Sequence, residues 1–170
     1  KYNRNVIPLN DMGVTNEHQI SSKKIDLSKT KLKLLWIGRI DELKCLNLLI
    51  ESVAKSKLIQ DNVEVTVIGD GPLLEEGKTL AKEAQVFEIF NFIGKIRHEE
   101  VNRHLLQNHL LVHTSIKEAG SSVILEAIST NTPFLSHDAF GMKFLIKNGL
   151  GFGVKLNDPH QSIDGFKKQI

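Results

Sequence analysis

Short apolar runs alternate with segments of helical spacing along most of this chain. The run KLKLLWIG at 31–38 predicts a strand, and the apolar positions 46, 49, 50, 53 and 54 that follow have the spacing of a helix. The same alternation predicts further strands at 63–69, 88–94, 109–115, 132–137 and 151–156, with helices at 72–84, 98–107, from near 121, at 141–147 and at 162–170. Such alternation predicts an α/β fold, a Rossmann-like doubly wound parallel sheet with helices on both faces.

The first 30 residues differ from the rest of the chain. They are rich in Asn, Ser, Lys and Asp and contain one short apolar run, VIPL. We interpret residues 1–30 as an interdomain connector with one edge strand, and residues 31–170 as the domain itself. At 170 residues, with 41% apolar and 25% charged residues, the chain has the balance of one globular domain. Its first residue is Lys rather than Met, which suggests a piece of a longer protein.

Charge and cysteine usage exclude some classes of protein. The net charge is +2, and the basic residues are spread along the chain rather than gathered into the basic face that nucleic-acid binding needs. The single cysteine, Cys45, excludes an internal disulfide and suits a reducing compartment. The sequence contains no apolar run of the length of a membrane span. We therefore expect a cytoplasmic protein that binds no nucleic acid.

Glycines and polar residues gather where the predicted strands end. The loops after the first five strands contain, in chain order, Gly38 and Arg39, Gly69 to Gly71, Gly94 and Lys95, Glu118, and Asp138 and Gly141. A single glycine there simply ends a strand, but five such loops favour a ligand site, because open parallel sheets bind ligands at their carboxyl edge. With the common strand order 3-2-1-4-5, the order reverses between the first and fourth strands, which we expect to be the centre of the site.

The stretch KEAGSSVILEAIS at 117–129 predicts a helix whose N-terminus binds an anion. The first backbone N–H groups of a helix lack partners and lie at the positive end of its dipole, which favours phosphate. Gly120, Ser121 and Ser122 leave that N-terminus accessible to a ligand. Arg39 and Lys44, from the loop after the first strand, complete a cationic site of the kind that binds a pyrophosphate.

Two carboxylates flank this predicted phosphate site. Glu118 precedes the helix and Glu126 lies more than one turn inside it, so each can accept hydrogen bonds from hydroxyl groups on one side of the phosphates. A sugar nucleotide has this layout. Glu75 and Glu83 have the same spacing within an ordinary predicted helix, so the prediction depends on the strand end and the small-residue turn, not on spacing alone.

From about Lys31 to Val154 the chain resembles the C-terminal domain of retaining GT-B glycosyltransferases of the group 1 type. The matching segments, in order, are LLWIGRIDELKCLNLLIESV, VEVTVIGDGPLLEEGKTLAKEA, NFIGKIRHEEV, LLVHTSIKEAGSSVILEAISTNTPFL and FGMKFLIKNGLGFGV. GDGP alone is a weak signal, whereas the ordered set is specific. The resemblance implies the donor-binding half of a retaining hexosyltransferase that moves a sugar from a nucleoside diphosphate sugar to a glycan or lipid-linked acceptor, as in polysaccharide biosynthesis.

The resemblance also implies a role for each matching residue. Arg39 and Lys44 hold the donor pyrophosphate, and Glu118 orients the hydroxyls of the donor sugar rather than acting as a covalent nucleophile. Glu126 binds the ribose. The implied catalytic residues are Glu118, Arg39 and Lys44. The implied donor-binding set, with the base near 95–96, is Gly38, Arg39, Lys44, Lys95, Ile96, Glu118, Gly120, Ser121, Ser122, Val123 and Glu126.

The chain departs from the family pattern at three places. Cys45 stands where the family usually has Gly after the lysine, and Ala119 to Ser121 replace a turn that more often contains Gly and an aromatic residue. Phe144 replaces a common Glu. None of these changes removes a phosphate contact, but the turn lines the sugar pocket, so the donor sugar stays open.

We expect no metal and no cofactor, since the nucleoside diphosphate sugar is a substrate. There is no Asp-x-Asp pair, and His104, His109 and His113 lack the spacing of metal ligands, so we interpret them as surface or strand-face residues. The partner implied by the resemblance is the protein's own N-terminal domain, which supplies the acceptor site. We therefore expect this fragment to be inactive alone, and any contact with the inner face of a membrane to involve the other half.

Two other functions fit the same residues. A sugar-nucleotide epimerase of the same fold differs in an acid or base of the missing half. A non-catalytic nucleotide-binding or interaction module would have inherited an inactive site. The presence of Arg39, Lys44, Glu118 and Glu126 together favours a working donor site over an inactive one.

Overall fold

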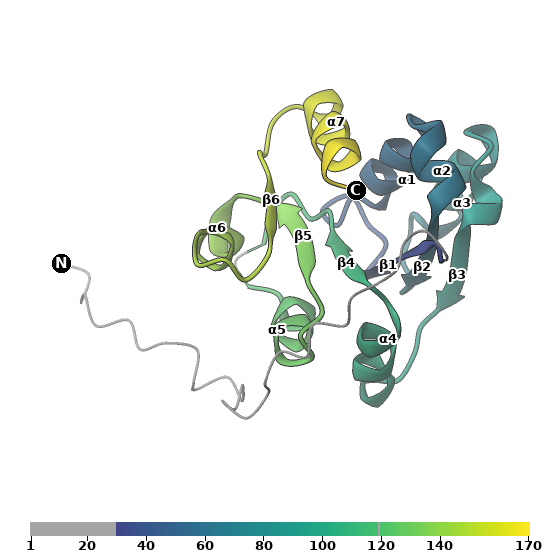
Figure 1. Ribbon diagram of the computed structural model, residues 1–170. Helices are drawn as coiled ribbons and strands as arrows, with labels where there is room; N and C mark the ends of the chain where they lie inside the picture. The colour runs from purple at the N-terminus through teal and green to yellow at the C-terminus, as the bar shows by residue number, and fades with distance from the viewer. Residues whose placement is uncertain (1–29, 119) are drawn as a thin grey trace, which may run out of the picture.

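The computed structural model describes residues 30–118 and 120–170, which fold around one six-stranded parallel sheet (Figure 1). The strands are β1 (Leu32–Ile37), β2 (Val63–Ile68), β3 (Phe90–Gly94), β4 (Leu110–His113), β5 (Phe134–His137) and β6 (Phe152–Val154). Their order is β3-β2-β1-β4-β5-β6, so the order reverses between β1 and β4, as predicted. The predicted doubly wound fold is confirmed, whereas the connector and its edge strand in 1–29 lie outside the described residues.

Helices connect the strands. They are α1 (Leu46–Ala54), α2 (Lys57–Asn62), α3 (Leu74–Glu83), α4 (Val101–Gln107), α5 (Ser122–Ser129), α6 (Phe140–Lys147) and α7 (Pro159–Gln169), with short 3-10 turns η2 (Phe87–Ile89) and η3 (His98–Glu100). The sequence pattern did not predict α2, a single short helix that Ser56 caps through the N–H of Ile59. It also started α7 three residues late, because Asp158 caps that helix and Pro159 occupies its first position.

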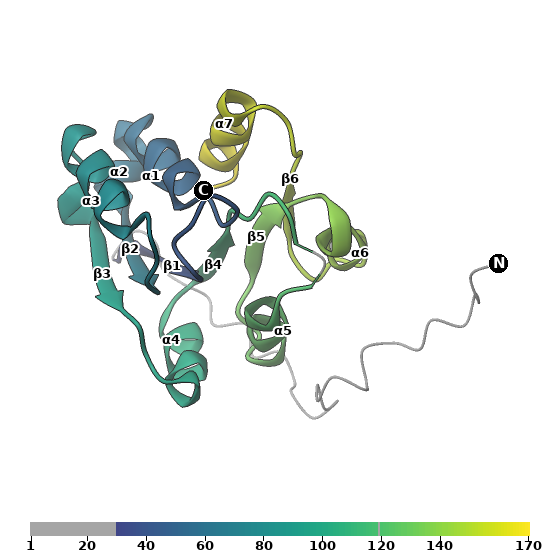
Figure 2. The same cartoon turned by 180° about the vertical axis from the view of Figure 1, so that it is seen from behind.

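The helices cover both faces of the sheet, as Figures 1 and 2 show from opposite sides. One buried cluster joins the sheet to α1, α3 and α7 and contains Leu34, Trp36, Leu49 and Phe166. The second joins the opposite face to α4, α5 and α6 and contains Leu35, Leu105, Ile124 and Leu145. Neighbouring residues of β1 therefore enter different cores, which explains why residues 34–37 are all apolar.

The loops after β1 and β2 lie backbone to backbone at the carboxyl edge of the sheet. A Cβ added at Gly69, whose φ is +143°, would lie 1.8 Å from the carbonyl oxygen of Gly38. A Cβ added at Gly71 would lie 2.3 Å from the carbonyl oxygen of Ile40. Packing therefore requires glycine at both positions. The close contact with the loop after β2 fixes the position of the loop after β1, which contains Arg39 and Lys44.

Candidate functional site

Hydrogen bonds join the loop after β1 to the loop after β4 across the point where the strand order reverses. The Trp36 indole N–H donates to the hydroxyl of Thr114 over 2.9 Å, and that hydroxyl donates to the carbonyl of Lys44 over 2.7 Å. The backbone N–H of Ile116 donates to the carbonyl of Leu43 over 3.0 Å. The two loops that carry the predicted site residues are therefore held together.

Asp41 organises the first of these loops. Its carboxylate accepts the backbone N–H groups of Leu43 and Lys44, each over 3.0 Å, and pairs with Arg39 over 3.5 Å. Our sequence analysis gave Asp41 no role. The signal in the sequence was an Asp in the loop shortly after a strand, since Asp side chains bond to the backbone two or three residues further on and so begin turns.

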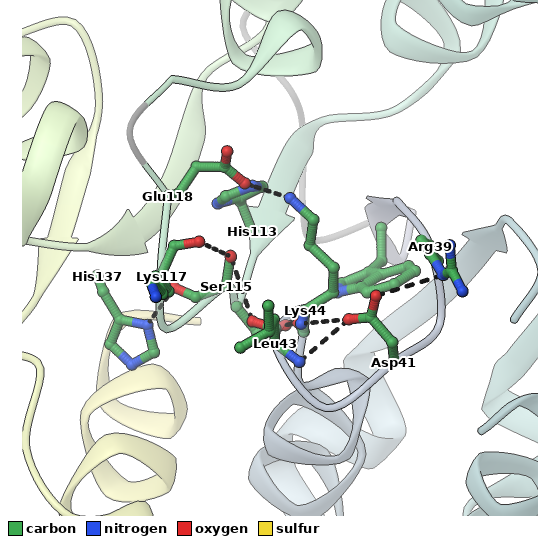
Figure 3. Close-up of polar contacts among 11 residues, drawn as sticks. Arg39, Asp41, Leu43, Lys44, His113, Ser115, Lys117, Glu118 and His137 are labelled. Atoms are coloured by element: carbon green, nitrogen blue, oxygen red, sulfur yellow. Dashed lines mark hydrogen bonds and ion pairs between the residues drawn. The ribbon is translucent and has the colours of Figure 1, made fainter. Parts of the chain in front are cut away.

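Lys44 and Glu118 meet directly, although 74 positions separate them in the sequence. The Lys44 ammonium donates to Oε2 of Glu118, as Figure 3 shows. Their side chains are only 28% and 16% exposed, so water screens the attraction less than at an open surface. Two of the residues predicted to bind the nucleotide-sugar donor, one cationic and one anionic, are thus in direct contact.

Two buried histidines lie behind this pair. Nε2 of His113, the last residue of β4, lies 3.6 Å from Oε2 of Glu118. Nδ1 of His137, on β5, donates to the carbonyl of Ser115 over 3.1 Å, because a carbonyl only accepts. Burial and the nearby Lys44 lower the pKa of His113 to about 4, so its ring is neutral at pH 7. Our sequence analysis treated His113 as a strand-face residue and did not place it near Glu118.

Arg39 lies apart from the Lys44 pair. Its side chain is 73% exposed and lines a cleft of about 470 Å³ together with Gly38, Lys95, Ile96 and His98. Figure 3 shows Arg39 on the far side of Lys44 from Glu118. Four predicted donor residues therefore share this cleft, while Lys44 and Glu118 lie beside it rather than among the described residues that line it.

Glu126 connects to the same cleft through His98. Oε1 of Glu126 lies 3.8 Å from Nε2 of His98, an exposed residue of the cleft wall that the sequence analysis did not consider. Burial raises the pKa of the Glu126 carboxyl. A hydroxyl-bearing ligand that reaches along the cleft past Arg39 would therefore meet a partly buried carboxylate on α5.

The N-terminus of α5 is open to a ligand. Ser121 is the N-cap residue, but its hydroxyl accepts no hydrogen bond from the first turn, and the first turn contains no acidic residue. Ser122 and Val123 form that first turn, and a Cβ added at Gly120 would meet nothing within 4 Å among the described residues. The unpaired backbone N–H groups there favour an anion.

Cys45 follows Lys44 in a left-handed backbone conformation, with φ 49° and ψ 52°. Glycine adopts this conformation without strain, which gives a physical reason for the glycine that the family usually has at this position. The thiol of Cys45 donates to the carbonyl of Glu42 over 2.8 Å. At this departure from the family pattern, Cys45 therefore adopts a backbone conformation that is strained for a residue with a side chain.

Within residues 30–118 and 120–170, no group of three or more His, Cys, Asp or Glu side chains is placed to hold a metal ion. In the same part of the chain, no helix combines the length and the apolar character that crossing a membrane requires.

Solved structures support the fold. The pneumococcal O-GlcNAc transferase GtfA, in complex with UDP and GlcNAc, matches with a TM-score of 0.72 and 16% identity over 84% of this chain and 29% of its own. Anabaena HepE in complex with UDP-glucose matches with a TM-score of 0.68 and 19% identity over 95% of this chain and 41% of its own.

Curated relatives are similar in sequence. The GPI3 subunit of phosphatidylinositol N-acetylglucosaminyltransferase from Saccharomyces cerevisiae (strain YJM789) is 27% identical over 75% of this chain and 28% of its own length. D-inositol 3-phosphate glycosyltransferase from Geodermatophilus obscurus is 24% identical over 88% of this chain and 35% of its own. The chain thus spans about a third of these relatives or less. The family model for glycosyl transferases group 1 matches residues 17–170, and the chain belongs to that family.

Proposed function

We propose that this chain is the donor-binding domain of a retaining glycosyltransferase, which transfers a hexose from a nucleoside diphosphate sugar to a glycan or lipid-linked acceptor. The observation that carries the proposal is the contact of Lys44 with Glu118, which precedes the uncapped N-cap residue of α5, Ser121, by three positions. A cation and a carboxylate in contact, followed closely in the chain by a helix N-terminus without a side-chain cap, would suit the phosphates and the sugar hydroxyls of one donor.

The positions of the other residues fit the remaining parts of the donor. Arg39 adds a second cation at the edge of the cleft, and Glu126 provides a carboxylate for ribose hydroxyls. The backbone near Lys95 and Ile96 lies at the wall of the same cleft, where the base would bind. The donor would then extend from Glu118 past the α5 N-terminus into the cleft.

In the proposed reaction the bond between the anomeric carbon of the sugar and the diphosphate oxygen breaks, and negative charge develops on the leaving phosphate. A bond from the same carbon to the acceptor hydroxyl oxygen forms on the same face of the sugar, and the proton of that hydroxyl passes to the leaving diphosphate. Lys44, Arg39 and the N–H groups of α5 stabilise that charge, because preorganised cations and dipoles require no reorganisation during the step. Glu118 holds the sugar hydroxyls. None of these contributions requires a metal ion.

The names and bound ligands of similar proteins are consistent with the proposed donor. GtfA and HepE were solved with UDP or UDP-glucose, and the GPI3 subunit and D-inositol 3-phosphate glycosyltransferase are named for sugar transfer. Because the chain spans about a third of its relatives or less, we propose that an N-terminal domain of the same protein supplies the acceptor site. We place the whole enzyme in the cytoplasm, with any contact to the inner membrane face through that domain.

Calorimetry with UDP, GDP and ADP tests the proposal. We expect at least one nucleotide to bind, and Lys44→Ala to weaken it about 10- to 100-fold while leaving the affinity for the matching nucleoside unchanged. The reason is that a hydrogen bond to a charged group contributes about 1.5–3 kcal/mol and the nucleoside has no phosphate. Lys57→Ala is the matched control, because Lys57 also pairs with a carboxylate, that of Asp61 on α2. Failure of all three nucleotides to bind would contradict the proposal.

A further inference from the structure

His113 is a buried polar side chain with no hydrogen-bond partner in the described residues. Its side chain is 5% exposed, and neither Nδ1 nor Nε2 bonds to any group in residues 30–118 and 120–170. The rest of β4 is Leu110, Leu111 and Val112, all apolar and buried. A buried polar atom without a partner lowers stability, so an apolar residue at the end of this strand would suit the fold better.

The nearest charged oxygen to His113 belongs to Glu118. Nε2 lies 3.6 Å from Oε2, and the Lys44 ammonium occupies the same oxygen. A movement of less than about 1 Å would bring Nε2 within hydrogen-bond distance. His113 is therefore one small displacement from becoming a second partner of the Glu118 carboxylate.

The Lys44 ammonium cannot pair equally well with Glu118 and with a bound diphosphate at the same time. The phosphates carry more negative charge than one carboxylate, so donor binding attracts the ammonium toward the phosphates. Glu118 would then keep its charge in a site that is only 16% exposed, and a buried carboxylate without a partner is unfavourable.

We propose that His113 is a positioning residue that donates its Nε2–H to Glu118 when Lys44 transfers to the diphosphate of the donor. The proposal rests on the proposed function for the identity of the ligand that attracts Lys44. A neutral imidazole donor fixes one carboxylate oxygen without cancelling the negative charge. The other oxygen remains free to accept hydrogen bonds from sugar hydroxyls.

Other charged or titratable groups near the His113 ring are consistent with a neutral donor. Lys44 and, to a smaller extent, His137 on β5 lower the pKa of His113, whereas Glu118 raises it. Burial has the largest effect, in the direction of the neutral form. At pH 7 the ring therefore has one N–H to donate, and the proposed hydrogen bond places it on Nε2.

A ligand-free double-mutant cycle tests the inference without depending on the nucleotide. In the parent, His113→Leu removes unpaired polar atoms, so we expect the Tm to stay the same or to rise. In a Lys44→Ala background, His113 is the remaining partner of Glu118, so His113→Leu should lower the Tm by about 3–6 °C. His113→Gln, which keeps an N–H donor near the position of Nε2, should restore most of that loss. The same change of Tm in both backgrounds would overturn the inference.

Nucleotide binding gives the second measurement. With whichever of UDP, GDP or ADP binds the parent, His113→Leu should weaken binding about tenfold, and His113→Gln less than threefold. In a Glu118→Gln background the effect of His113→Leu should fall below twofold, because no charged carboxylate remains to be held. Parent-like binding by His113→Leu overturns the inference alone. Binding of no nucleotide by the parent contradicts the proposed function, and the thermal cycle then decides separately whether His113 supports Glu118.

Discussion

Helices α5 and α7 differ in how the backbone N–H groups of their first turns are satisfied. At α7 the Asp158 carboxylate accepts a hydrogen bond from the N–H of Gln161 over 3.1 Å. Pro159, which has no N–H, occupies the first helical position, where an N–H would have no partner within the helix. At α5 the hydroxyl of Ser121 caps nothing. Both are α-helices of the same domain, so the difference arises from the residues at each N-terminus.

The comparison separates a helix end built for stability from one available to a ligand. The capped end of α7 already has an anion from its own chain. The region before α5 instead combines uncapped N–H groups with the unpaired ring of His113 and the half-buried Glu118. Functional sites commonly retain such unfavourable features, which the rest of the fold compensates.

The largest expected effect is the loss of stability in acid that His113 causes. Its folded-state pKa of about 4 lies below the ordinary 6.5, so between these pH values the unfolded chain binds more protons and stability falls as the pH falls. The shift corresponds to a loss of about 3 kcal/mol by pH 4. Urea unfolding of the parent and of His113→Leu at pH 7, 5.5 and 4 measures it.

The His113→Leu protein should lose less stability over that range, while the contribution of His137 stays in both proteins. Burial lowers the pKa of His137 as well, so some acid sensitivity remains in the variant. Identical pH profiles for the two proteins would show that the ring of His113 is not held neutral by the fold.

Closing the α5 end with an anion should remove nucleotide binding. Ser121→Asp adds a carboxylate that caps the first turn and repels the phosphates, so we expect about a 100-fold loss of affinity for the nucleotide that binds the parent. Ser121→Asn caps without the charge and should give a smaller loss. Calorimetry measures both. Parent-like binding by Ser121→Asp would place the phosphates elsewhere.

Removing the N-cap side chain of each helix should lower stability at α7 and leave it nearly unchanged at α5. Asp158→Ala should lower the free energy of unfolding by about 1 kcal/mol, because α7 loses its side-chain cap. Ser121→Ala should change it by less than about 0.3 kcal/mol, since this hydroxyl makes no cap bond. Chemical denaturation gives both values, and equal losses would remove the contrast between the two helices.

The smallest expected effect comes from Gly120. Among residues 30–118 and 120–170, a Cβ there meets nothing within 4 Å, so Gly120→Ala should leave the Tm within about 1 °C of the parent. If the donor lies at the α5 N-terminus as proposed, the added methyl takes part of its space, and we expect severalfold weaker binding of the nucleotide that binds the parent. A large fall in Tm would mean that the glycine serves the fold rather than the ligand.

The sheet could be predicted because its signals are local. Strands β1 to β5 are short apolar runs, and the alternation with helices, together with the usual strand order, predicted the reversal between β1 and β4. The α2 helix was not predicted, because its six residues form too few turns to show a periodic apolar pattern. The start of α7 was set by a cap and a proline, signals that lie outside the apolar repeat.

The candidate site could be proposed from the sequence only as a set of residues, and not as a set of contacts between them. Lys44 and Glu118 were both candidates, but their direct contact depends on backbone hydrogen bonds between two loops. His113 has an apolar sequence neighbourhood and becomes noticeable only once β4 ends beside Glu118. The position of Arg39 in the cleft, apart from Lys44 and Glu118, likewise depends on the loop that Asp41 organises.

Cys45 makes the candidate site observable by spectroscopy. It is the only cysteine of the chain and directly follows Lys44. Burial, and to a lesser extent Asp41, raises the pKa of its thiol, so alkylating reagents react slowly with it at neutral pH and faster in alkaline buffer. A fluorophore or spin label attached there needs no removal of other thiols. One label beside the loop of Lys44 would then report the rate at which a ligand arrives and leaves, which equilibrium titrations do not measure.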